Sequence, residues 1–240
     1  MTEISPATTI GDIVARDLRS AAVFARHGID FCCGGGRSLG DVCREQGLDS
    51  EAVARELRAA SAAADPLADA TGWPLDRLID HIVTKHHAYV RAQIPVIQGY
   101  TAKLAARHGE RLPVMAQIAR VFDELAEELS RHMDKEERIL FPFIDAMVVA
   151  KDTCSRVAKT PFGTIQNPIR MMELEHQDAG DHLWQLRALT GNFEPPAEAC
   201  ATWRACFAAL ADFERDMHEH VHLENHVLFP AATRLEEELH

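Results

Sequence analysis

Apolar residues recur at spacings of three and four along the C-terminal part of the chain, which is the pattern of amphipathic α-helices. Four long helices can be drawn in this way. The stripe of the second helix reads Ile118, Phe122, Leu125, Leu129, His132, Glu136, Ile139 and Phe143. The stripe of the fourth reads Trp203, Cys206, Leu210, Phe213, Met217, His220, Glu224, Val227 and Ala231. In each stripe a histidine and a glutamate are the only polar members, so we expect these side chains to point into the core.

The other two long helices also carry histidines within their apolar faces. The first begins near Pro74 and runs into the adjacent pair His86 and His87. The third begins near Pro168 and has His176 in the middle of its stripe. Four amphipathic helices with inward polar groups at a similar depth are typical of a bundle that holds a metal in its core. The pattern therefore predicts an all-α fold with a four-helix bundle.

The N-terminal part of the chain has shorter periodic segments, for which Thr9 and Ser50 are the expected N-caps of the first and last helix. These four segments are Ile10–Leu18, Ser20–His27, Ser38–Gln46 and Ser50–Ala60. Small residues, Asp and Pro follow, and the helical period is lost there. We expect a small helical domain at residues 1–62, a linker at 63–72 and the bundle at 73–240, with connections between bundle helices at 99–113 and 149–167.

Composition narrows the classes of function. The chain has 240 residues, 47% of them hydrophobic, and a formal net charge of −12. A surplus of acidic residues disfavours binding to phosphate backbones, so we expect no nucleic-acid partner. There is no signal-like N-terminus and no apolar run of membrane-spanning length, so we expect a cytoplasmic protein with no membrane partner. Without an export signal, the six cysteines are interpreted as reduced thiols.

The strongest motif is a histidine followed four residues later by a glutamate, which occurs twice with the same trailing Phe-Pro. The copies are His132-x-x-x-Glu136 and His220-x-x-x-Glu224, and a spacing of four places both side chains on one helix face. A lone histidine precedes each copy: 45 residues separate His87 from His132, and 44 separate His176 from His220. Buried carboxylates and imidazoles need a partner, which predicts a metal site. Because the motif occurs twice, the site is predicted to be dinuclear.

The ligand types favour iron or manganese. Imidazole and carboxylate donors without a thiolate suit these metals, whereas zinc usually takes fewer ligands in a tetrahedral arrangement. Two bridging carboxylates can hold a pair of ions about 3.5 to 4 Å apart. Coordination positions remain open on such a pair for oxygen species, nitric oxide or water.

Adjacent cysteines form a second unusual motif, Cys32-Cys33, within a glycine-rich segment. Adjacent Cα atoms are about 3.8 Å apart, below the usual disulfide span of roughly 4.4 to 6.8 Å, so a bond between the two would be strained and easily reduced. The pair suits reversible redox chemistry, contact with a soft metal or an iron–sulfur cluster, or nitrosylation. The alternative is two small residues packed in a turn.

These residues resemble a known family. The motifs that carry the resemblance are Asp80-His81-Ile82 with His87, the segments His132–Pro142, Glu173–Gly180 and His220–Pro230, and the string Asp30–Gly35. The C-terminal part is similar to hemerythrin-like domains, which are up-down four-helix bundles. The whole chain resembles the iron–sulfur cluster repair di-iron proteins, whose small N-terminal domain carries the Cys-Cys pair.

The resemblance implies a cofactor of two non-haem Fe ions that are carboxylate-bridged, and it leaves open whether an oxo group also bridges them. It implies the metal ligands His87, His132, Glu136, His176, His220 and Glu224, with Glu136 and Glu224 as the bridges, and assigns redox or iron-transfer roles to Cys32 and Cys33. The implied function is repair of iron–sulfur clusters damaged by nitrosative or oxidative stress, through supply of iron to damaged iron–sulfur proteins. The alternatives are a protein that binds or reduces nitric oxide, and an oxygen-binding storage or sensor protein. Whether the protein is an enzyme stays open, and so does its oligomeric state, a homodimer included.

Three assignments depend on register. Helical periodicity alone places His86 nearer the centre of the apolar stripe than His87, whereas the family pattern selects His87 as the ligand. We expect His86, Glu128 and Glu175 to contact ligands or line the site, although plain surface carboxylates are an equal interpretation of the two glutamates. His218, His222 and His226 also recur at a spacing of four. We interpret them as a solvated face, with a zinc or nickel site as the alternative.

Overall fold

The computed structural model describes residues 4–16, 19–29, 31, 35–60, 70–156 and 161–239. These residues form helices joined by turns, and within them the only β-type pairing is an isolated bridge between Thr9 and Ser38. The predicted all-α class is therefore confirmed. None of the helices in these ranges combines the length and the apolar character needed to cross a membrane.

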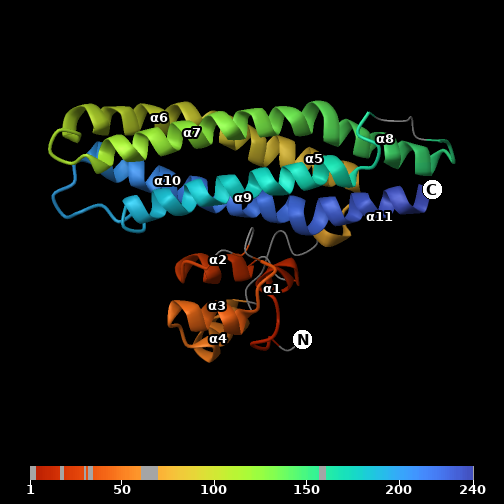
Figure 1. Ribbon diagram of the computed structural model, residues 1–240, viewed down its shortest axis with the longest axis horizontal. Coiled ribbons are helices and arrows are strands. Elements are labelled where there is room, and N and C mark those ends of the chain that lie inside the picture. Colours follow the sequence, from red (N-terminus) through yellow and green to blue (C-terminus); the bar gives the residue numbers. More distant parts are fainter. Residues whose placement is uncertain are drawn as a thin grey trace.

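Four long columns of helix lie side by side (Figure 1). The first consists of α5 (Leu75–His81), η2 (Ile82–His87) and α6 (Ala88–His108), and the second of α7 (Val114–Lys135), η3 (Glu136–Leu140) and α8 (Phe141–Asp152). The third is α9 (Gln166–Leu189), and the fourth consists of α10 (Ala201–Leu223), η4 (Glu224–Leu228) and α11 (Phe229–Leu239). Helix α6 packs against α7 and α10, and α7 packs against α9. Successive columns run in opposite directions, so the bundle has up-down topology (Figure 1).

The apolar interior of the bundle is divided by a polar layer. One buried cluster includes Phe122, Phe213 and the apolar side chains of α6, α7, α9 and α10 on one side of the layer. A second cluster includes Ile144, Phe229 and the apolar side chains of α5, α8 and α11 on the other side. The buried histidines and glutamates lie between these clusters, so the bundle encloses them away from water.

The structure corrects the predicted connections. Helix α6 continues to His108, so residues 99–108 are helical and only residues 109–113 connect it to α7. The reason is visible in the sequence, since the buried residues Ile97, Thr101 and Leu104 keep the helical spacing. The second connection is also shorter than expected, because α8 ends at Asp152 and α9 begins at Gln166.

Short helices α1 (Ile10–Arg16), α2 (Arg19–Arg26), α3 (Leu39–Gln46) and α4 (Ser50–Ala60) form the N-terminal part. Thr9 is the cap expected for α1, because its Oγ1 accepts a hydrogen bond of 3.1 Å from Asp12 N. For α4 the expected cap is wrong. Asp49 Oδ1 accepts from Glu51 N at 3.0 Å, while Ser50 is the first helical residue.

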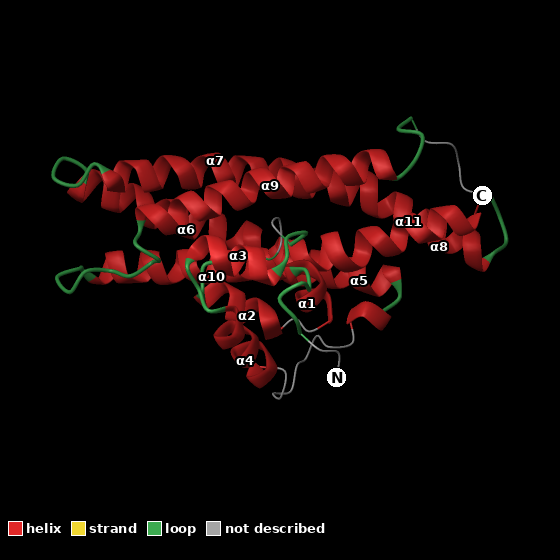
Figure 2. Ribbon diagram, turned by 60° about the horizontal axis from the view of Figure 1, so that its bottom comes forward, coloured by secondary structure: helices red, strands yellow, loops and turns green. Residues whose placement is uncertain are grey.

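The N-terminal helices pack against one side of the bundle, next to α10 and η4 (Figures 1 and 2). The ring of Phe31 meets the ring of His218 edge-on, with 4.8 Å between centroids. Gly11 approaches His226 so closely that a Cβ atom at this position would lie 3.0 Å from His226 Cε1. This packing covers one face of the column formed by α10 and η4, and the same column carries His220 and Glu224.

Candidate metal centre

Three of the four columns contain a π-helical turn at the level of the polar layer. Segment η2 ends with His87, η3 begins with Glu136, and η4 begins with Glu224. A π-helical turn inserts one residue into an α-helix and occurs frequently at functional sites. Each turn rotates the residues that follow it relative to an uninterrupted helix, so it determines which side chains reach the interior.

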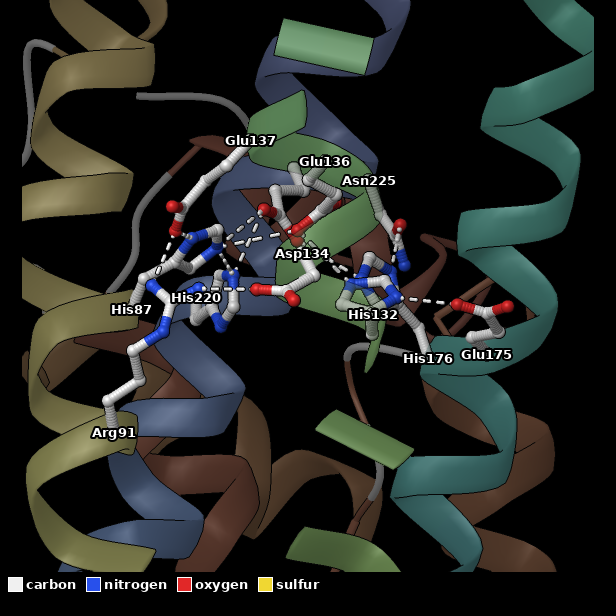
Figure 3. Close-up of polar contacts among 11 residues, drawn as sticks. His87, Arg91, His132, Asp134, Glu136, Glu137, Glu175, His176, His220 and Asn225 are labelled. Atoms are coloured by element: carbon white, nitrogen blue, oxygen red, sulfur yellow. Dashed lines mark hydrogen bonds and ion pairs between the residues drawn. The ribbon is translucent and has the colours of Figure 1, made fainter. Parts of the chain in front are cut away.

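The side chains in the polar layer form two groups that share both carboxylates (Figure 3). One group comprises His87, Glu136, His220 and Glu224, and the other comprises His132, Glu136, His176 and Glu224. All six residues are buried, and within each group the candidate ligand atoms lie within 4.8 Å of one another. The structure thus brings together all six residues that the sequence predicted as ligands.

The imidazole rings converge on the centre through their Nε2 atoms. The distance between Nε2 atoms is 3.1 Å for His87 and His220, and 3.0 Å for His132 and His176. Glu136 Oε2 lies 3.4 Å from His87 Nε2 and 3.3 Å from His132 Nε2, so this carboxylate faces both groups.

Glu224 uses one oxygen for each group. Its Oε1 lies 3.0 Å from His220 Nε2, and its Oε2 lies 3.1 Å from His176 Nε2. A carboxylate with one oxygen toward each of two ligand groups has the arrangement of a bridging ligand.

Outward-facing hydrogen bonds fix the orientation of three rings. The Nδ1–H of His87 donates to Glu137 Oε1 at 2.7 Å, and that of His132 donates to Glu175 Oε2 at 2.9 Å. The Nδ1–H of His176 donates to Asn225 Oδ1 at 2.8 Å. A proton on Nδ1 leaves the Nε2 lone pair directed at the centre, which is the tautomer that binds metal ions.

The electrostatics of the centre favour positive charge. Burial opposes protonation of His87 and His132, but the neighbouring carboxylates outweigh it and raise both pKa values to about 10. Burial likewise acts to raise the pKa of Glu224, yet the surrounding histidines hold it well below its usual value. The centre therefore binds either protons on its imidazoles or metal ions between them.

The donor set fits a pair of metal ions. Two Nε2 lone pairs about 3 Å apart repel each other unless a cation lies between them. Both oxygens of Glu136 are buried, and neither has a hydrogen-bond partner among the residues that the structure describes. Bound cations satisfy both the lone pairs and the carboxylate, and nitrogen and oxygen donors without thiolate suit iron.

His87 and His86 have different surroundings, although both are buried. His87 belongs to the ligand group, whereas His86 Nδ1 lies 3.0 Å from Asp216 Oδ1 and the His86 ring lies parallel to the ring of His220. The turn η2 explains why periodicity favoured His86, since the extra residue moves the inward position on by one.

Glu175 and Glu128 both line a pocket of about 200 Å³ that opens beside His132. Glu175 contacts the centre directly, because it binds the ring of His132 and forms an ion pair with Lys135, and these bonds lower its pKa to about 2. Glu128 instead lies 3.4 Å from His182 Nδ1.

Glu137 and Asn225, which orient the lone histidine of each half, were not predicted as functional residues from the sequence. A signal for them was present. Each residue directly follows the glutamate of the repeated motif, and each accepts a hydrogen bond from a histidine of another helix. Their polar side chains next to Glu136 and Glu224 are therefore part of the duplication.

The predicted solvated face at His218, His222 and His226 is wrong. His222 is only 2% exposed, and its ring centroid lies 4.9 Å from that of His226. The N-terminal helices cover this face, which helical periodicity within one segment does not reveal. Cys32 and Cys33 lie outside the described residues.

Comparisons with known proteins match both parts of the chain. Residues 6–61 match a family described as a domain of unknown function (DUF542), and residues 78–232 match the hemerythrin HHE cation binding domain. The chain is 36% identical over 225 residues to the iron-sulfur cluster repair protein YtfE of Citrobacter koseri, covering 93% of this chain and 95% of that protein. The proteins of the same name from Musicola paradisiaca and Escherichia coli O157:H7 are 36% and 35% identical. These alignments cover 94% and 93% of this chain and 96% and 95% of the relatives.

Proposed function

Because the chain belongs to the hemerythrin HHE family and, over nearly its full length, to the iron-sulfur cluster repair proteins, we propose that it repairs damaged iron–sulfur clusters with a non-haem di-iron centre. The observation that carries this proposal is the pair of buried groups that share Glu136 and Glu224. The proposed partners are proteins whose iron–sulfur clusters have lost iron. The proposed compartment is the cytoplasm, where reduced thiols are stable, and Cys43, Cys154, Cys200 and Cys206 are free.

We assign the six clustered residues as the metal ligands. His87 and His220 would hold one ion and His132 and His176 the other, with Glu136 and Glu224 shared between them. Each ion would have four protein ligands, so an octahedral iron would keep positions open to nitric oxide or an oxygen species. Two bound irons supply one-electron redox chemistry and exchangeable coordination positions. The protein's own contribution is to orient the imidazoles, through Glu137, Glu175 and Asn225, and to exclude water.

We propose that the protein acts as an iron donor. The pocket beside His132 supports this idea, because it leads from the solvent to a ligand. It is lined by three acidic residues, Glu128, Glu175 and Asp178, and two basic ones, Arg131 and Lys135, of which Arg131 is paired with Glu127. Carboxylates along a passage attract a divalent cation and offer it oxygen ligands. The half-exposed Lys135 is paired with Glu175, so its charge opposes entry less than a free ammonium group would.

We propose that residues 1–62 act as a dithiol domain that contacts the recipient protein or relays the ion through Cys32 and Cys33. Support comes from the preceding residue, Phe31, whose ring packs on His218 two positions before the ligand His220. Phe31, which directly precedes the two cysteines in the sequence, is thereby packed on the helix that carries part of the centre.

The test is an iron-transfer assay. Reduced protein loaded with two Fe²⁺ is mixed anaerobically with a cluster-depleted aconitase, and the recovery of aconitase activity is followed. We expect faster and more complete recovery than an equal amount of free Fe²⁺ produces. The control is Cys32→Ser/Cys33→Ser protein with the same iron content, which separates the role of the thiols from that of the centre. No recovery beyond that of free iron would overturn the donor proposal.

A further inference from the structure

The four histidines of the centre are not equivalent in their outward contacts. Three of them donate from Nδ1 to a side-chain oxygen, as described above. The fourth, His220, has its Nδ1 buried and without a hydrogen-bond partner among the described residues. The parallel neighbour of its ring is His86, at a centroid distance of 5.6 Å, and the Nδ1 of His86 is itself engaged with Asp216.

An acceptor on the outer nitrogen matters for metal affinity. It fixes the tautomer and orientation of a ligating imidazole and increases the basicity of the inner nitrogen, and its loss typically lowers metal affinity by about 10 to 100-fold. His220 lacks this support, and its Nδ1–H is withdrawn from water without compensation. It is therefore the weakest ligand of the four.

A second difference acts in the same direction. Glu137 Oε1 accepts from His87 and also from Arg91 Nη1, at 2.6 Å, so a single oxygen serves both donors. In Glu175 the two donors use separate oxygens, since His132 binds Oε2 and Lys135 binds Oε1. An oxygen shared with a guanidinium is a weaker acceptor for the imidazole. His87 is thus less well supported than His132. The bridging carboxylates are common to both groups, so the missing acceptor on His220 is the main difference between them.

We propose that the two metal positions differ in affinity by about 10 to 100-fold, and that the ion held by His87 and His220 is the more weakly bound. At limiting free iron, the ion held by His132 and His176 remains. This inference rests on the proposed di-iron centre and ranks its two positions by affinity.

The test is an equilibrium competition. Protein loaded with two Fe²⁺ is equilibrated anaerobically against graded concentrations of a chelator, and bound iron per chain is measured. An equilibrium measurement does not depend on exchange rates, which the pocket beside His132 could raise for the ion held by His132 and His176. We expect iron loss in two steps, from two ions to one and from one to none, separated by about 10 to 100-fold in free iron. Anomalous diffraction from crystals of the one-iron form should place that iron between His132 and His176.

Two matched variants make opposite predictions. Asn225→Ala removes the acceptor from His176, so it should weaken the retained ion and bring the two steps together. Glu137→Ala removes the acceptor from His87, so it should weaken the other ion and move the steps further apart. Arg91 keeps a partner in that variant, because it also binds Asp134. Asn225→Asp replaces the amide oxygen with a charged acceptor, so it should preserve or widen the wild-type separation.

The outcomes distinguish this inference from the proposed function. A single step in the wild-type protein, or a retained iron between His87 and His220, overturns the inference and leaves the di-iron centre intact. Parallel shifts in Asn225→Ala and Glu137→Ala also overturn it, because they would show that the acceptors do not act on separate ions. A protein that never binds two irons overturns the proposed centre and this inference together.

Discussion

Glu136 and Glu224 each form the first residue of a π-helical turn, four residues after a histidine of the same column, and both belong to both ligand groups. Both are fully buried. Burial and the neighbouring Glu224 act to raise the pKa of Glu136, but the surrounding histidines outweigh them and lower it. Because both carboxylates are ionised and buried, cations are needed to compensate their negative charge.

Replacing either glutamate should therefore reduce the number of bound irons. Glu136→Leu and Glu224→Leu keep an apolar side chain of similar size, which the core accepts, but remove a donor from both groups. We expect each variant to retain at most one iron per chain, measured by elemental analysis of the purified holoprotein. Glu127→Leu is the control, because Glu127 forms only an exposed ion pair with Arg131. Two irons in both glutamate variants would contradict the bridging assignment.

The identity of the six clustered residues could be predicted from the sequence, whereas the register beyond them could not. The stripe up to His132 has the ordinary α-helical period, so spacing sufficed there. After the turn η3 the buried residues include Leu140, Phe141 and Ile144, while the predicted Ile139 is 50% exposed. The extra residue of a π-helical turn shifts the stripe by one position, and a fixed period cannot anticipate it.

A similar shift follows η4. The predicted Val227 is buried, but Leu228 and Phe229 are buried more completely, and Ala232 is buried in place of the predicted Ala231. Contacts between distant segments could not be predicted from the sequence pattern either. The packing of the N-terminal residues on His218 and His226 and the hydrogen bond from His176 to Asn225 depend on tertiary arrangement, so periodicity within one helix could not predict them.

The contact between the N-terminal helices and the bundle depends on the missing side chain of Gly11. A Cβ atom there would lie 3.0 Å from Gly35 O and 3.0 Å from His226 Cε1, and the backbone oxygen cannot move independently. We expect Gly11→Ala to destabilise the protein by about 1 to 3 kcal/mol. Urea unfolding measures this, and amide hydrogen exchange in α1 should increase. Gly36→Ala is the matched control, since a Cβ there meets nothing within 4 Å. Equal stability of the two variants would disprove the tight contact.

Glu236 of α11 holds the start of α9. Its Oε1 accepts from Ile165 N at 2.8 Å and its Oε2 accepts from Thr164 Oγ1 at 2.5 Å, so it satisfies a buried amide at a helix N-terminus. We expect Glu236→Ala to lower the free energy of unfolding by about 1 to 3 kcal/mol. Glu238→Ala, which removes an exposed ion pair with Lys151, should change it by less than about 0.5 kcal/mol. Similar losses in both variants would argue against the capping role.

Cys206 gives the protein a defined alkaline instability. The side chain is fully buried on α10, and burial raises the pKa of its thiol to about 12. In the unfolded chain a thiol ionises near pH 8.5. Between these values the unfolded state loses a proton that the folded state keeps. The contribution of Cys206 to stability therefore falls by about 1.4 kcal/mol per pH unit as the pH rises above roughly 9.

Cys206→Ala removes this pH-dependent contribution and leaves all other titrating groups in place. The stability difference between wild type and variant should be constant from about pH 7 to 8 and shift in favour of the variant above about pH 9, as measured by urea unfolding under reducing conditions. A difference that stays constant to about pH 10.5 would show that the thiol ionises at the same pH in the folded and unfolded states.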